Sequence, residues 1–220
     1  MTIEAVLFDL DGTLLDTAKD LGSAINHVLK INHKAPLSFE ESRPFVSGGT
    51  PALINLGFGI KIGEPGYDKL KNEFLSYYES NLCEYSSPFP GIMETLDLIE
   101  QKQLAWGIVT NKPGYLTAPL LTQLSLSERS SVTISGDTYE KKKPDPYPLL
   151  EAAKIIDVNP QKTLYVGDDE RDIIAAKAAN MISVSVGWGY PGEKNPKSWN
   201  ADFHIESSEE LTSFIEFQIG

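Results

Sequence analysis

Short runs of apolar residues alternate with helical patterns along most of the chain. The runs cover residues 6–8, 106–109, 132–134, 163–166 and 182–186. Runs that are apolar at nearly every position are typical of parallel strands buried on both faces. Between the runs, apolar residues recur at helical spacing, as at Ile92, Leu96 and Ile99. Strands that alternate with helices predict an α/β fold, with a Rossmann-like core built on a doubly wound parallel sheet.

The alternation stops between residues 16 and 84, where only helical patterns remain. Leu21 and Ile25 share one apolar helical face, and Leu70 and Phe74 share another. We interpret this segment as a small helical cap that is inserted after the first strand and lies over the edge of the sheet where ligands bind. The predicted domains are an α/β core of residues 1–15 and 85–220 and a helical cap domain of residues 16–84.

The composition is that of a soluble globular protein, with 41% hydrophobic and 23% charged residues in a chain of 220. No stretch approaches the roughly 20 apolar residues of a membrane span, and the first residues lack the basic segment of a signal peptide. The net charge of −12 disfavours binding to nucleic acid. A single cysteine, Cys83, permits no disulfide within the chain. We therefore expect a cytoplasmic protein, a monomer or weak homodimer, with no membrane or nucleic-acid partner.

Polar and charged side chains follow the predicted strands at the points where the strands end. Ligands of open α/β sheets bind at the carboxyl ends of the strands, so these residues are expected to meet at one edge. The segments that follow the strands or occupy the loops between them are Asp9-Leu10-Asp11-Gly12-Thr13, Thr110-Asn111-Lys112-Pro113, Lys141-Lys142-Lys143-Pro144 and Gly167-Asp168-Asp169-Glu170-Arg171-Asp172.

The paired carboxylates of Asp9 and Asp11 indicate a cation site. In an extended backbone, residues two apart face the same way, so the two charges repel unless a cation lies between them. Mg²⁺ prefers one or two carboxylates together with water and phosphate oxygens. Asp168 can supply a further ligand, and Asp172 can support the ligands from behind. The sequence therefore predicts a magnesium site that can hold a phosphate group.

The same residue types can perform phosphoryl transfer. An aspartate carboxylate can attack phosphorus and form an aspartyl phosphate. A second aspartate can protonate the leaving oxygen and later activate water. Thr110 can hold phosphate oxygens, and Lys143 can offset their charge. Of the three consecutive lysines, we expect only Lys143 to turn inward.

Other interpretations of these segments are weaker. Asp9-x-Asp11-Gly12 lacks the spacing of a calcium loop, because its glycine comes fourth instead of sixth. Residues 187–192 match G-x-G-x-x-G, but no helix pattern follows them, which disfavours a dinucleotide site. The three histidines, His27, His33 and His204, show no metal-ligand spacing.

Four segments, taken in order, resemble the four motifs of the haloacid dehalogenase-like hydrolases. They are Asp9-Leu10-Asp11-Gly12-Thr13-Leu14, Thr110-Asn111, Lys143-Pro144 and Gly167-Asp168-x-x-x-Asp172. The resemblance implies a Mg²⁺-dependent enzyme with Asp9 as nucleophile, Asp11 as general acid and base, and Lys143 as a phosphate-binding catalytic residue. It implies the metal-binding residues Asp9, Asp11 (through its backbone carbonyl), Asp168 and Asp172. The expected phosphate- or substrate-binding residues are Gly12, Thr13, Thr110, Asn111, Lys143, Arg43, Ser47 and Gly48.

Within that family, the chain resembles phosphoglycolate phosphatases, which implies hydrolysis of a small phosphate monoester in carbohydrate metabolism. Segments such as 46–49 and 166–172 are also similar to N-acetylmuramic acid 6-phosphate phosphatases, which act in the recycling of cell-wall sugars. Asp169 departs from the family, where a small hydroxyl residue is common, and adds an acid beside the predicted metal. A sugar phosphomutase or a non-catalytic regulatory protein are the remaining alternatives.

Overall fold

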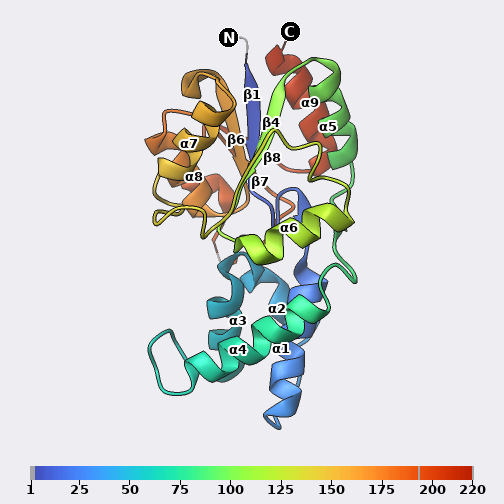
Figure 1. Ribbon diagram of the computed structural model, residues 1–220, viewed down its shortest axis with the longest axis vertical. Coiled ribbons are helices and arrows are strands. Elements are labelled where there is room, and N and C mark those ends of the chain that lie inside the picture. The colour runs from blue at the N-terminus through green and yellow to red at the C-terminus, as the bar shows by residue number, and fades with distance from the viewer. Residues whose placement is uncertain (1–2, 193, 220) are drawn as a thin grey trace.

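The computed structural model describes residues 3–192 and 194–219, and its centre is a six-stranded parallel sheet (Figure 1). The strand order is β5-β4-β1-β6-β7-β8. The strands are β1 (Ala5–Phe8), β4 (Ala105–Val109), β5 (Val132–Ile134), β6 (Thr163–Gly167), β7 (Ile182–Val186) and β8 (Phe203–Ile205). The five predicted strands are confirmed, and the predicted α/β class with them. The edge strand β8 was not predicted, because it is short and only its last residue is buried.

Helices cover both faces of the sheet. Helices α7 (Tyr147–Ile155) and α8 (Glu170–Ala178) lie on one side, and α5 (Ile92–Gln101) and α9 (Ser208–Ile219) lie on the other (Figure 1). Successive residues of β1 point to opposite faces of the sheet. Leu7 packs into the hydrophobic core beneath α7 and α8, while Val6 and Phe8 pack into the core on the other face. The remaining elements of this part are α6 (Gly114–Gln123) and the short 3₁₀ helices η2 (Pro160–Lys162) and η3 (Pro196–Trp199).

A group of helices between β1 and α5 forms a separate body at the lower end of the molecule (Figure 1). It consists of α1 (Ala18–Ile31), α2 (Phe39–Ser42), η1 (Arg43–Gly48), α3 (Gly49–Phe58) and α4 (Tyr67–Ser80). These elements, here called the cap, pack on one another through apolar faces that include Ile25 and Phe74. We propose them as the cap domain of residues 16–84. Among the described residues, no helix is long and apolar enough to cross a membrane.

Two short strands tie the ends of the cap together. β2 (Leu15–Asp16) pairs antiparallel with β3 (Ser87–Pro88), so the chain leaves the sheet domain and returns to it at neighbouring points. The buried carboxylate of Asp20 strengthens this junction, because it accepts hydrogen bonds from the backbone of Tyr85 and from both the backbone and the hydroxyl of Ser86.

The register of the central strands determines which residues meet at the edge facing the cap. Phe8 of β1 pairs with Ile108 of β4 on one side and with Val166 of β6 on the other. Adjacent parallel strands lie about 4.8 Å apart, so the residues that follow them emerge side by side. Asp9 therefore emerges between the segments that begin at Thr110 and Asp168.

Candidate active site

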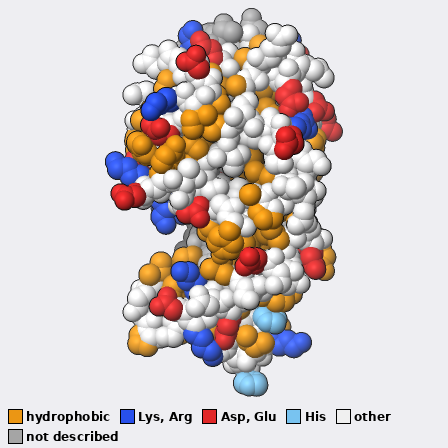
Figure 2. Space-filling model, in the orientation of Figure 1, with side chains coloured by type: hydrophobic (Ala, Val, Ile, Leu, Met, Phe, Trp, Pro, Cys, Tyr) orange, Lys and Arg blue, Asp and Glu red, His pale blue; other side chains and the backbone are white. Residues whose placement is uncertain are grey.

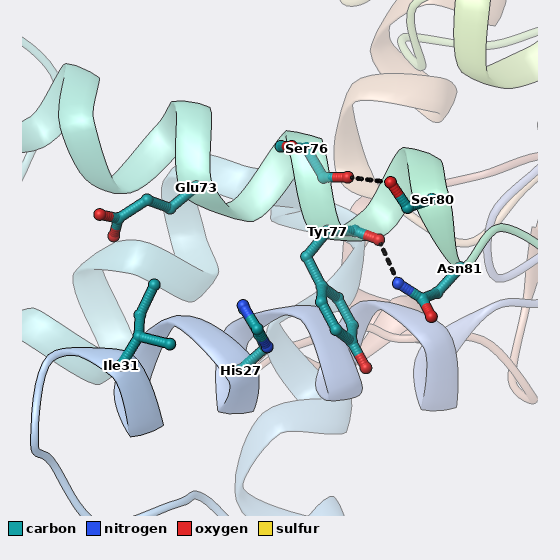
Figure 3. Close-up of a pocket in the computed structure, with 7 residues that line it drawn as sticks. All are labelled: His27, Ile31, Glu73, Ser76, Tyr77, Ser80 and Asn81. Atoms are coloured by element: carbon teal, nitrogen blue, oxygen red, sulfur yellow. Dashed lines mark hydrogen bonds between the residues drawn. The ribbon is translucent and has the colours of Figure 1, made fainter.

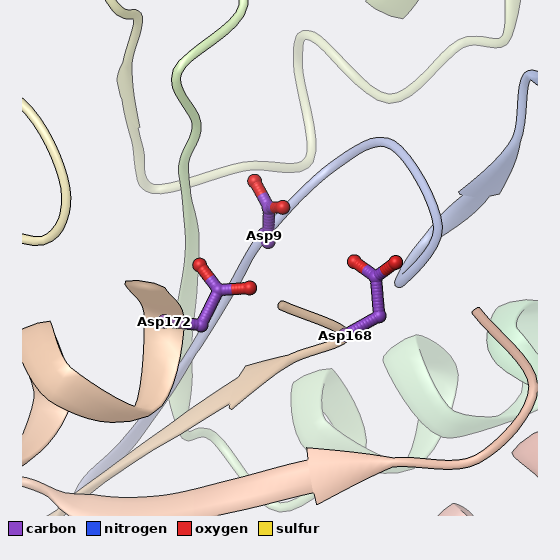
Figure 4. A group of neighbouring side chains, drawn as sticks. All are labelled: Asp9, Asp168 and Asp172. Carbon is purple, nitrogen blue, oxygen red and sulfur yellow. The ribbon is translucent and has the colours of Figure 1, made fainter. Parts of the chain in front are cut away.

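Three aspartates form a cluster at the carboxyl ends of β1 and β6. Asp9 follows β1, Asp168 follows β6, and Asp172 lies in the first turn of α8, and their carboxylates project to the same side (Figure 4). Each offers a carboxylate oxygen, and these oxygens all lie within 4.8 Å of one another. Asp168 and Asp172 are buried, while Asp9 remains partly open to solvent. This arrangement can ligate a small cation or lie beside a phosphate group.

Lys143 supplies a positive charge to the cluster from the loop before α7. Its Nζ lies 2.8 Å from Asp9 Oδ1 and 2.7 Å from Asp172 Oδ1. Nζ also donates to the hydroxyl of Tyr165, which itself donates to the carbonyl of Val109. Burial alone would lower the pKa of Lys143, but Asp172 and Asp9 raise it above its ordinary value. Lys143 is therefore a buried, charged ammonium group, whereas its neighbours Lys141 and Lys142 are exposed, as predicted.

The carboxylates of the cluster carry more negative charge than Lys143 balances. Burial, together with the charge of Asp9, raises the pKa of Asp168. Burial also raises the pKa of Asp172, although Lys143 opposes the rise. Asp9 Oδ1 touches the lysine, yet within the described part of the chain it accepts no well-directed hydrogen bond. A buried carboxylate oxygen without a directed donor, among acids whose charged forms repel, fits a divalent cation, and the all-oxygen donor set suits Mg²⁺.

Asp11 lies apart from this cluster. Its Oδ1 accepts from the hydroxyl of Thr17 at 2.7 Å, and Lys112 Nζ lies 3.1 Å from Oδ1 and 3.3 Å from Oδ2. Asp11 therefore contacts Lys112, whereas Asp9 contacts Lys143. The cation site that the sequence predicts between these two carboxylates stays a prediction. A metal contact through the backbone carbonyl of Asp11 stays a prediction.

Gly12 and Thr13 shape the turn against Asp168. Gly12 has a φ of +86°, and a Cβ built there would lie 2.1 Å from Asp168 Oδ2, so no other residue fits without displacing that carboxylate. The Thr13 hydroxyl donates to Asp168 Oδ1 at 3.1 Å, and the backbone N–H of Tyr190 donates to Oδ2 at 2.8 Å. These contacts fix the orientation of Asp168. The Thr13 hydroxyl thus binds an aspartate in this structure, whereas the sequence predicted that Thr13 binds phosphate.

Thr110 and Asn111 follow β4 at the same edge. The Thr110 hydroxyl accepts from the backbone N–H of Lys112 at 3.2 Å. The Asn111 side chain donates to the backbone carbonyl of Lys143 at 2.9 Å, which ties the loop that carries the buried lysine to the end of β4. Asn111 therefore holds Lys143 in place, and the expected role of Thr110 toward phosphate stays a prediction.

The predicted cap residues Arg43, Ser47 and Gly48 lie on η1, which contacts Asp168 from the cap. The Ser47 hydroxyl donates to Asp168 Oδ2 at 2.7 Å, whereas Gly48 is exposed at the end of η1. The Arg43 guanidinium donates to the backbone carbonyls of Trp188 and Gly189 and lies over the ring of Tyr190. In this conformation Arg43 joins the cap to the segment after β7, so a direct substrate contact stays a prediction.

Asp169 is used differently from what its sequence position suggested. Its carboxylate caps the N-terminus of α8 and pairs with Arg171, with Oδ1 2.7 Å from Arg171 Nε. Arg171 in turn donates to the backbone carbonyl of Ser47 at 2.7 Å. Asp169 and Arg171 therefore form a contact between the sheet domain and the cap.

Sequence reasoning did not single out Lys112, Tyr165 or Arg171 as parts of the site. Lys112 could have been found, because it comes directly after Thr110-Asn111 at the end of a strand. Tyr165 lies inside a strand whose residues are nearly all apolar, so the hydrophobic pattern predicts a buried core residue. That pattern does not show that the Tyr165 hydroxyl reaches Lys143. Arg171 lies among acids on a helix, where an ordinary surface pair is the simpler interpretation.

The surface is indented where the cap meets the sheet domain, and apolar side chains gather beside the indentation (Figure 2). A separate open groove of about 330 Å³ lies on the cap between α1 and α4 (Figure 3). His27 lines this groove and stacks on Tyr77, with the ring centroids 4.2 Å apart. Since the groove is lined by cap residues alone and by none of the predicted site residues, His27 serves in helix packing.

Comparison with known proteins gives consistent matches. The sequence pattern of the haloacid dehalogenase-like hydrolases matches residues 6–186. The chain is 44% identical over 208 residues to a phosphoglycolate phosphatase of Xanthomonas campestris pv. campestris, which covers 94% of each chain. It is 39% identical over 218 residues to an N-acetylmuramic acid 6-phosphate phosphatase of Pseudomonas aeruginosa, covering 98% of this chain and 96% of that protein.

Solved structures agree with these sequence matches. The crystal structure of a predicted phosphoglycolate phosphatase from Haemophilus somnus superposes with a TM-score of 0.87 at 25% identity. The superposition covers 97% of this chain and 98% of the other, so it includes the cap as well as the sheet domain.

Proposed function

Because this chain belongs to the haloacid dehalogenase-like hydrolase family, we propose that it is a phosphatase that hydrolyses small phosphate monoesters through Asp9. The observation that carries the proposal is the cluster of Asp9, Asp168 and Asp172 around the buried ammonium group of Lys143. A structural ion pair would need one acid and one base. Here Lys143 contacts both Asp9 and Asp172, and a third carboxylate, that of Asp168, lies within 4.8 Å of theirs at the edge of the sheet where ligands bind.

In the first step, a carboxylate oxygen of Asp9 attacks phosphorus and the bond from phosphorus to the ester oxygen breaks. The leaving oxygen keeps the electron pair of that bond and takes a proton from Asp11, which releases an alcohol. The product is an aspartyl phosphate on Asp9. Lys143 already lies beside Asp9, so its charge can offset that of the phosphoryl oxygens during the transfer.

In the second step, water attacks the phosphorus of the aspartyl phosphate and gives a proton to Asp11. The bond from phosphorus to the oxygen of Asp9 breaks, which releases inorganic phosphate and regenerates both carboxyl groups. The cap excludes bulk water while the phosphoenzyme exists, through the contacts of Ser47 and Arg43 with the sheet domain.

We propose that Asp9, Asp168 and Asp172, with the backbone carbonyl of Asp11, hold or support a Mg²⁺ ion. When bound, such an ion supplies positive charge that neutralises phosphate oxygens and polarises the phosphoryl group. The directed contacts of Thr13 and Tyr190 fix the orientation of the Asp168 carboxylate, which lies close to that of Asp9.

For the substrate we propose phosphoglycolate, since the relatives at 44% identity are phosphoglycolate phosphatases. A second candidate is N-acetylmuramic acid 6-phosphate, because the Pseudomonas aeruginosa relative spans 98% of this chain. Both substrates join a phosphate to an alcohol carbon and carry a carboxylate, so the chemistry at Asp9 is the same. The two differ in the bulk that the space between cap and sheet domain must accept.

The test of the reaction is the variant Asp9→Asn together with acid trapping of the wild-type enzyme during turnover. We expect the variant to release no phosphate and the trapped wild type to carry phosphate on Asp9. A variant with normal turnover, or an adduct on another residue, would refute the role of Asp9. Ranking kcat/KM over phosphoglycolate, N-acetylmuramic acid 6-phosphate, hexose phosphates and nucleotides then identifies the substrate.

The same assay separates the remaining alternatives. A sugar phosphomutase would convert one sugar phosphate into its isomer with little free phosphate. A non-catalytic protein would release no phosphate from any ester, including an aryl phosphate. Release of stoichiometric phosphate contradicts both.

A further inference from the structure

The ammonium group of Lys112 joins the cap to Asp11. Lys112 lies in the loop after β4, and its Nζ donates to both carboxylate oxygens of Asp11, at 3.1 and 3.3 Å. The same Nζ donates to the hydroxyl of Tyr78 at 2.8 Å. Tyr78 belongs to α4 of the cap, so one lysine contacts a residue of each domain.

These contacts are buried and directional. The Lys112 side chain is 5% exposed, and Tyr78 is buried against Phe74. The backbone N–H of Lys112 donates to the Thr110 hydroxyl, which fixes the base of the side chain. A buried ammonium group is costly unless it is paired, so this lysine has little freedom to move away from Asp11.

Asp11 is consequently held from two sides. Thr17, at the start of the cap, donates to Oδ1 at 2.7 Å, and Lys112 approaches both oxygens. The side chain of Asp11 is 18% exposed, so it still opens toward solvent where a substrate can reach it. Neither Lys112 nor Tyr78 belongs to the cluster of Asp9, Asp168 and Asp172.

We propose that Lys112 is a positioning residue that orients the carboxyl group of Asp11 for proton transfer, and that the hydroxyl of Tyr78 holds Lys112 in place. The inference rests on the proposed function, in which Asp11 donates a proton to the leaving oxygen. Since Tyr78 is part of the cap, the orientation of the acid depends on the cap being docked against the sheet domain.

The leaving group distinguishes this role from a purely structural one. When the bond from phosphorus to the ester oxygen breaks, an alkoxide must be protonated, whereas para-nitrophenolate leaves readily without a proton. General acid catalysis contributes about 10²- to 10⁴-fold to a rate. A misplaced Asp11 therefore slows the first step for an alkyl phosphate far more than for an aryl phosphate. The ratio kcat/KM reports this step, whereas a general loss of folded enzyme lowers kcat/KM for both substrates equally.

The experiment compares kcat/KM, which reports the step that releases the leaving group, for phosphoglycolate and para-nitrophenyl phosphate in Lys112→Met, Lys112→Arg and the wild type, with Asp11→Asn as reference. For Lys112→Met we expect the loss on the alkyl phosphate to exceed the loss on the aryl phosphate by about tenfold or more. Asp11→Asn should show the same discrimination, and Lys112→Arg should recover part of it because it retains the charge.

Tyr78→Phe provides an independent measurement that leaves the lysine in place. It removes only the hydroxyl, and we expect a smaller discrimination of the same sign. Tyr77→Phe is the matched control, since Tyr77 is the preceding residue of α4 and its ring stacks on His27. If Lys112→Met does not fold, the comparison of these two tyrosine variants decides.

Each outcome bears on the proposal. Equal losses on both substrates, or a gain on the alkyl phosphate, in Lys112→Met would overturn it, and so would identical behaviour of Tyr78→Phe and Tyr77→Phe. These results leave the proposed function intact provided that wild-type hydrolysis requires Asp9. If the wild type hydrolyses no phosphate ester, the proposed function fails first and this inference fails with it.

Discussion

Replacing Lys143 by methionine removes the charge at the centre of the acidic cluster, and its cost can be derived from the contacts. The lysine side chain is 3% exposed and lies within 2.8 Å of both Asp9 and Asp172. Removing one partner of a buried ion pair costs about 3–5 kcal/mol, and such burial leaves little solvent screening. Asp172, whose pKa is already raised by burial, can take up a proton in the variant, so we expect a loss near the lower limit, about 3 kcal/mol.

The measurement is urea unfolding of metal-free protein beside the kinetics of phosphate release. A domain is stable by about 5–15 kcal/mol, so the variant should still fold. With a slope of about 2–3 kcal/mol per molar urea, the midpoint should fall by about 1–1.5 M. Turnover should fall by about 10²- to 10³-fold, as when a preorganised donor to a charged transition state is removed.

Lys142→Met is the matched control, because it makes the same substitution one residue earlier at an exposed position. We expect its stability and turnover to stay close to those of the wild type. The reasoning is refuted if Lys143→Met turns over normally, or if its unfolding midpoint shifts no more than that of Lys142→Met.

Three other predictions follow from the geometry. Gly12→Ala places a Cβ 2.1 Å from Asp168 Oδ2 at a φ of +86°, so turnover should fall by more than about tenfold and the melting temperature should drop; wild-type kinetics would contradict the contact. Burial raises the pKa of Asp168 and of Asp172. At pH values above the ordinary pKa of a carboxyl group, the folded metal-free protein therefore binds more protons than the unfolded chain. Its melting temperature should consequently rise as the pH falls from about 8 to about 6. A flat or opposite trend in thermal melts would refute this sign, and added Mg²⁺ should weaken the trend. Treatment with a chelator should abolish phosphate release and re-addition of Mg²⁺ should restore it; full activity without divalent metal would refute the metal role.

The sheet could be predicted from the sequence because its strands are buried on both faces. The run at 6–8 and the run at 106–109 are apolar at nearly every position, and both proved to be central strands. The edge strand β8 escaped prediction, since Phe203 is exposed and His204 is half-buried, as in many loops. Strands β2 and β3 have two residues each, too few to form any pattern.

The cluster of Asp9, Asp168 and Asp172 could be anticipated for a related reason. Parallel strands end at one edge, so residues that follow neighbouring strands must meet there. The direction of each side chain could not be anticipated in the same way. Asp11 stands beside a turn, and its partner Lys112 also reaches Tyr78 of the cap, so both contacts are defined only by the packed structure.

The pairing of β2 with β3 has a consequence for how this protein can vary. The chain departs from the sheet domain at Asp16 and rejoins it at Ser87, and these residues are direct partners across the pair. Since the two connections are neighbours, a segment of different length or shape can replace the cap without stretching any strand of the sheet. The sheet domain, which carries Asp9, and the cap can therefore diverge separately during evolution, because they lie on opposite sides of this narrow two-stranded junction.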